Sequence, residues 1–64
     1  MKLSKIKINM LMARKQLTVT ALAKRSGVSR SRMTVILSNS DATPICAGKL
    51  AQALEVDVTE ILED

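Results

Sequence analysis

Apolar residues recur three or four positions apart along the whole chain, and strand-like alternation is not sustained anywhere. This spacing is typical of helices that bury one face. Ser4, Thr18, Ser29, Thr43 and Asp57 can each cap a helix N-terminus, because their side chains accept hydrogen bonds from first-turn backbone N–H groups. The sequence therefore predicts an all-α fold of five short helices, over about residues 4–15, 18–27, 29–38, 43–54 and 57–62.

The predicted connections contain residues that tolerate the backbone conformations of turns. Gly27 can take the left-handed conformation that ends the second helix, and it opens a three-residue turn that closes at Ser29. Asn39 is expected to end the third helix in the same conformation. Pro44 has a fixed φ that suits the first turn of the fourth helix.

The composition restricts how this fold can be stabilised. Aromatic residues are absent, so the core has to be aliphatic. A chain of 64 residues forms one domain, residues 1–64, and buries only about 60% of its unfolded surface. One cysteine and no histidine exclude a disulfide framework and the usual zinc clusters, and no cofactor is expected. Self-association is therefore the remaining way to stabilise so small a core. The residues expected in the core are Ile8, Leu11, Met12, Leu22, Ala23, Val28, Met33, Ile36, Leu37, Cys46, Ala47, Leu50 and Leu54.

Charge divides the chain into two unlike halves. Residues 1–40 contain nine bases and no acid, whereas residues 41–64 contain six acids and a single base, so +9 and −5 sum to the net +4. A basic surface of this size most commonly meets nucleic acid. No membrane span or secretory signal is recognisable, and the free thiol indicates a reducing cytoplasm. We therefore expect the basic half to face a polyanion and the acidic half to face away.

The second and third predicted helices have the spacing of a helix-turn-helix. Two helices that cross closely need a small residue at their contact, and Ala23 has that position. Four residues later the turn needs a positive φ, which Gly27 provides. Val28 follows beneath the turn, and Met33 and Ile36 face inward from the next helix. The joint match indicates a helix-turn-helix within the basic half.

The segment TVTALAKRSGVSRSRMTVILSN, residues 18–39, resembles the core of lambda-repressor/Cro-type (XRE-type) DNA-binding domains. The resemblance extends from about Ile8 to Leu62, and the tail from Leu50 is similar to the ending that these domains often show. It implies a compact five-helix lambda-repressor-like bundle that inserts its third helix into the DNA major groove.

Three features depart from the pattern of this family. The family often begins its second helix with a Gln that contacts a phosphate, where this chain has Val19. Many members pair an Arg on the first helix with a Glu near the end of the third. Met12 and Leu37 take these positions here, and an apolar contact can replace such an ion pair. The loop before Pro44 is slightly longer than usual and would bring Asp41 near DNA.

The outward face of the third helix has side chains suited to reading bases. It contains no acid, and it presents one Arg, three hydroxyls and one Val at helical spacing. Arg binds guanine O6 and N7, hydroxyls donate or accept, and Val packs on a thymine methyl. We expect base contacts from Arg30, Ser31, Thr34 and Val35, and phosphate contacts from Lys15, Thr18, Thr20, Lys24, Arg32, Ser38, Asn39 and Ser40.

The first of two functional hypotheses is a small sequence-specific transcriptional regulator, of the phage or mobile-element repressor type. It would bind double-stranded DNA at a pseudo-palindromic operator as a homodimer. The chain has no separate effector domain, so no small-molecule ligand is expected. The dimer interface is expected near the C-terminus, where too little chain follows to cover the apolar residues Val56, Val58, Ile61 and Leu62.

The second hypothesis is a protein-interaction module on the same fold, such as an antitoxin-like or adaptor domain. Its acidic half would bind a basic partner, and Val19 and Asp41 favour this interpretation. Catalysis finds no support in either case, because no His or other suitably placed base is present to activate a hydroxyl.

Overall fold

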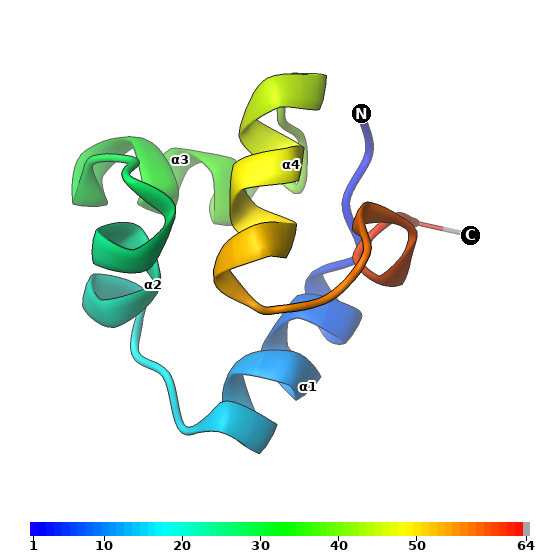
Figure 1. Cartoon of the computed structure of the whole chain (residues 1–64). Coiled ribbons are helices and arrows are strands. Elements are labelled where there is room, and N and C mark those ends of the chain that lie inside the picture. Colours follow the sequence, from blue (N-terminus) through cyan, green and yellow to red (C-terminus); the bar gives the residue numbers. More distant parts are fainter. Residues whose placement is uncertain (64) are drawn as a thin grey trace.

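The computed structural model describes residues 1–63 and confirms the all-α fold class (Figure 1). Four α-helices follow one another along the chain, and a single turn of 3-10 helix comes after them. Within the described residues, β-pairing is limited to two isolated bridges. The elements are α1 (Lys5–Lys15), α2 (Val19–Ser26), α3 (Arg30–Asn39), α4 (Pro44–Ala53) and η1 (Val58–Glu60).

The N-terminus of each α-helix begins where the capping residues predicted it. Ser4, Thr18, Ser29 and Thr43 each accept a hydrogen bond from the backbone N–H three residues later, at 3.1 to 3.3 Å. Pro44 is the first residue of α4, as its fixed φ predicted. Local hydrogen bonding therefore accounts for these four boundaries.

Two predicted helix ends are wrong. The left-handed residue after α3 is Ser40, with φ 55°, and Asn39 remains helical. The carbonyl of Ser40 accepts a hydrogen bond from the Leu3 N–H at 2.8 Å, a contact that holds the chain in its turn. The expected fifth helix is only the three-residue η1, because Leu62 pairs with Leu3 in an isolated bridge and the chain is extended there.

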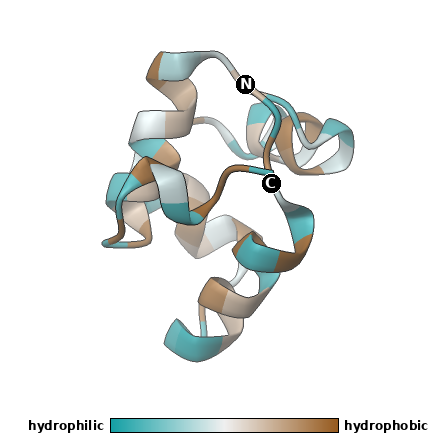
Figure 2. Ribbon diagram, turned by 90° about the vertical axis from the view of Figure 1, so that its right-hand side faces the viewer, coloured by the Kyte–Doolittle hydropathy of each residue, from teal (hydrophilic) through white to brown (hydrophobic). Residues whose placement is uncertain are grey.

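The core is aliphatic and is supplied by every helix. Figure 2 shows hydrophobic residues distributed over all four α-helices. α2 packs against α3 and α4, and α4 packs against η1. Leu11, Met12, Val28 and Leu37 cover the core as partly buried residues. The side chains with almost no exposure are Leu3, Ile8, Leu22, Met33, Leu50, Leu54 and Ile61.

The segment before α1 belongs to the core, although no sequence pattern places it there. Leu3 is 0% exposed. Its N–H binds the end of α3 at Ser40, and the N–H of Ser4 donates to the carbonyl of Ile61 at 2.7 Å. The segment therefore ties the α3–α4 connection to the C-terminal residues.

Replacing Leu3 with alanine is expected to lower the free energy of unfolding by about 2–5 kcal/mol, because it leaves a cavity beneath this segment. The matched control is Ile45→Ala, since Ile45 is 73% exposed and its removal should change stability by less than about 0.5 kcal/mol. Urea unfolding followed by circular dichroism, at one protein concentration, measures both. Equal effects of the two variants would contradict this account of Leu3.

Candidate nucleic-acid interface

The turn between α2 and α3 is built around the carbonyl oxygen of Ala23. This oxygen accepts the N–H groups of Gly27 at 3.0 Å and Val28 at 3.2 Å, and the hydroxyl of Ser26 at 3.1 Å. Gly27 has φ 75°, as the predicted turn requires. Ser26 is buried, and no sequence pattern indicates its role in the turn. These contacts fix the direction in which α3 leaves α2.

The outer face of α3 is open to solvent. Val35 is 56% exposed, a large exposed fraction for an apolar side chain. The hydroxyl of Thr34 donates to the carbonyl of Arg30 at 3.0 Å, so its oxygen can still accept a hydrogen bond. All four residues expected to contact bases are exposed: Arg30, Ser31, Thr34 and Val35.

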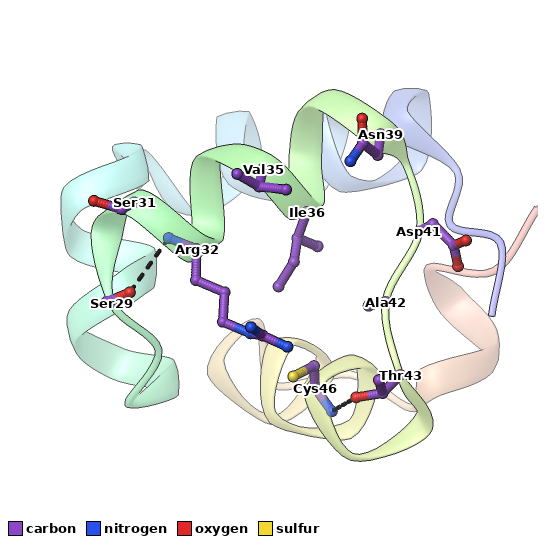
Figure 3. A pocket seen from close by; sticks show the side chains of 10 residues that line it. All are labelled: Ser29, Ser31, Arg32, Val35, Ile36, Asn39, Asp41, Ala42, Thr43 and Cys46. Carbon is purple, nitrogen blue, oxygen red and sulfur yellow. Dashed lines mark hydrogen bonds between the residues drawn. The ribbon is translucent and has the colours of Figure 1, made fainter.

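A groove of about 700 Å³ lies between α3 and the first turn of α4 (Figure 3). Ser31, Val35 and Asn39, spaced four residues apart, line its α3 side. The side chain of Arg32 extends across it toward Cys46 on α4. The groove therefore adjoins the outer face of α3 and contains a guanidinium.

Cys46 lines this groove and also packs against the core as a partly buried residue, so its expected burial is only partial. It lies in the first turn of α4, beside the groove. Its N–H donates to the hydroxyl of Thr43 at 3.3 Å. The pKa of the Cys46 thiol is lowered, mainly by a hydrogen bond with the Thr43 side chain. The Arg32 guanidinium is the second cause.

Asp41 lies just after the end of α3 and lines the groove. Its Oδ1 is 3.2 Å from the amino nitrogen of Met1, which also donates to the carbonyl of Ala42 at 2.8 Å. This ammonium lowers the pKa of the Asp41 carboxyl. Figure 3 shows the carboxylate directed away from Arg32. The one acid at the groove is thus paired with a positive charge.

Most of the residues expected at phosphates lie on α2 and α3. Lys24, Thr18 and Thr20 are exposed on α2 or at its start, and α2 packs directly against α3. The remainder of this group lies along α3 and at its end: Arg32, Ser38, Asn39 and Ser40.

Lys15 is not brought to that surface. Its Nζ is 3.9 Å from a carboxylate oxygen of Glu55, which Arg25 also contacts at 3.5 Å. In Figure 1 the end of α1 lies at the opposite end of the molecule from α3. The structure therefore separates Lys15 from the other expected phosphate contacts.

Lys5 is a base near α3 that sequence reasoning missed. Its Nζ donates to the carbonyl of Ser38, in the last turn of α3, at 3.4 Å. Because 33 residues separate the two in sequence, no local pattern signals the contact. Lys5 adds positive charge beside Ser38 and Asn39.

The four residues expected at a dimer interface fall into two groups that differ in burial. Val56, Val58 and Leu62 are partly buried and pack against the core. Ile61 is 0% exposed and lies in the core of its own chain. Ile61 therefore has no surface left for a second copy, in contrast to the expectation.

The described surface joins a helix-turn-helix to an exposed, acid-free helix face with bases beside it. A family model for the Cro/C1-type HTH DNA-binding domain matches residues 7–64. The chain belongs to this Cro/C1-type family. Membership confirms the resemblance of residues 18–39 and identifies a DNA-binding domain. No curated protein and no solved structure matches the chain.

In this Cro/C1-type domain the family departures are accommodated by packing. Val19 is partly buried at the start of α2 and packs against the core. Met12 and Leu37 are also partly buried against the core, which suits apolar residues in place of an ion pair. Among the described residues, no helix is long and apolar enough to span a bilayer.

The two glycines are expected to respond in opposite directions to the same substitution. Gly27→Ala should lower the free energy of unfolding by about 1 kcal/mol, because φ 75° is unfavourable for alanine. Gly48→Ala should raise it by about 0.5–1 kcal/mol, because Gly48 lies inside α4 and an added methyl meets no atom within 4 Å. Thermal unfolding of both variants tests this, and two shifts of one sign would refute it.

Proposed function

We propose that the chain is a sequence-specific transcriptional regulator that binds double-stranded DNA with α3 in the major groove. The observation that carries the proposal is the outer face of α3, which is exposed and free of acids, and is oriented by the turn at Ala23. An α-helix with side chains is about 10–12 Å across, which fits a major groove about 12 Å wide.

The proposed contacts fall into two classes. Arg30 donates to guanine O6 and N7, Val35 packs on a thymine methyl, and Ser31 and Thr34 complete the reading of base edges. Arg32, Lys24 and the residues at the two ends of the helix-turn-helix bind phosphates, which position the domain without reading sequence. Lys5, at the end of α3, joins this second class.

We further propose that the regulator is a repressor of the phage or mobile-element type, acting in the cytoplasm as a homodimer. Its operator would be a pseudo-palindrome with half-sites about 34–36 Å apart, one turn of DNA. Regulation would depend on the abundance of the protein or on a partner, without a small-molecule ligand.

The alternative role as a protein-interaction module keeps only one of the two features that favoured it. Val19 packs against the core and still leaves the start of α2 without a phosphate-binding Gln. Asp41 is paired with the Met1 ammonium. The exposed bases of α2 and α3 favour a polyanionic partner instead.

The test is selection from a random duplex DNA pool at about 150 mM salt, followed by sequencing of the bound fraction. Enrichment of an inverted repeat is expected. Enrichment of one half-site would retain sequence-specific binding but remove the dimeric operator. A folded, helical protein that enriches no sequence would overturn the proposed function.

Arg30 and Arg32 are expected to make different kinds of DNA contact, Arg30 to a base and Arg32 to a phosphate. Arg30→Ala should cost about 1–3 kcal/mol on the selected site and relax the preference at one base pair, because a base contact is lost. Arg32→Ala should weaken binding to all sequences alike and reduce the slope of log K against log salt by about 1. Binding titrations at several salt concentrations distinguish the two, and a uniform loss for Arg30→Ala would make Arg30 a phosphate contact.

A further inference from the structure

One face of α1 is apolar and exposed. Ile6 is 73% and Met10 is 60% exposed, and Ala13 continues the same stripe one turn later. Ile8, on the opposite side of the helix, is buried in the core. Ile6 and Met10 expose more apolar surface to solvent than Val56 and Val58 near the C-terminus, which are partly buried. A stripe of this kind marks an interaction surface.

A small groove of about 180 Å³ runs beside this stripe, between α1 and η1. Met10 and Leu11 give it an apolar floor, and Arg14 on α1 and Glu60 on η1 give it charges of both signs. Lys7, which also lines the groove, donates from Nζ to the carbonyl of Leu62 at 3.1 Å. Through Glu60 and the Lys7–Leu62 contact, the groove lies beside the C-terminal residues.

The presence of both charges restricts the occupant. With one charge of each sign, the groove favours neither an acidic nor a basic partner. A second copy related by a twofold axis matches both charges, because each contact in such an interface occurs twice, with the roles exchanged. We propose that this surface binds a second copy, with Ile6 and Met10 against the partner's groove and Arg14 facing the partner's Glu60.

The location of the surface suits a DNA-binding dimer. Lys5 at the start of α1 contacts Ser38, but in Figure 1 the C-terminal half of α1 and η1 lie away from α3, so pairing through them leaves the outer face of α3 uncovered. Methionine is flexible enough to fill an irregular groove, which suits Met10 to this contact. The inference rests on the homodimer of the proposed function and assigns its interface mainly to α1.

The first experiment is the mass of the full chain by sedimentation velocity, from about 5 to about 200 µM. The double variant Ile6→Gln with Met10→Gln should raise the dimer dissociation constant at least about tenfold, because apolar contact area is lost on both copies. Ile45→Gln is the matched control, because Ile45 is as exposed as Ile6 but lies on α4. It should leave the dissociation constant unchanged.

The second experiment uses the two charges. Arg14→Glu and Glu60→Arg should each weaken self-association about tenfold, because like charges then face each other twice across the interface. An equimolar mixture of these two variants should recover dimers, since every reversed charge meets an opposite charge on the other variant. Only pairing between chains gives this recovery, because a contact within one chain cannot be restored by mixing.

Each outcome is decisive. A dimer that is insensitive to the α1 variants and to mixing would overturn this interface while leaving the homodimer intact. A wild-type chain that remains monomeric at all these concentrations and binds DNA as one copy would overturn both the interface and the homodimer. Sequence-specific DNA binding is measured separately by the selection experiment, so its failure is distinguishable from either result.

Discussion

The orientation of α3 depends on three hydrogen bonds to one oxygen atom. The carbonyl of Ala23 accepts from the backbone of Gly27 and Val28 and from the buried hydroxyl of Ser26. Ala23 is itself 4% exposed, so a larger side chain there would push the neighbouring helices apart. Because the cap at Ser29 follows directly, α3 begins in a fixed direction. The burial of Met33 and Ile36 then fixes which face of α3 remains outside.

The sequence could predict those parts of the fold that neighbouring residues determine. The caps at Ser4 and Thr43 and the turn at Gly27 involve contacts over five residues or fewer. The end of α3 was different, because Asn39 is the residue that tolerates the left-handed conformation better, yet Ser40 adopts it. The contact that holds Ser40 comes from Leu3, and a local pattern has no access to it.

The candidate site follows the same division. Exposure of the outer face of α3 could be inferred from helical spacing, and the expected base contacts are all accessible. The places of Lys5 and Lys15 could not be inferred, because both depend on partners more than thirty residues away. The exposed side of Cys46 could not be inferred for a related reason. The groove that it lines depends on how α4 is placed beside α3.

The arrangement of charge shows why net charge alone does not locate a binding surface. Glu55, at φ 60°, contacts both Lys15 and Arg25, so the positive charges of these two bases are offset by a carboxylate. The exposed bases of α3 therefore contribute a larger share of the positive potential that a polyanion meets at this helix. The outer face of one α3 has only four side chains proposed for base contacts, and a good base contact commonly discriminates by about 1–3 kcal/mol. Specific sites are commonly favoured over other DNA by about 4–10 kcal/mol, a range that two copies reach more readily than one. Under the proposed homodimer, a chain with so small a reading face and so small a core would gain both specificity and stability from pairing.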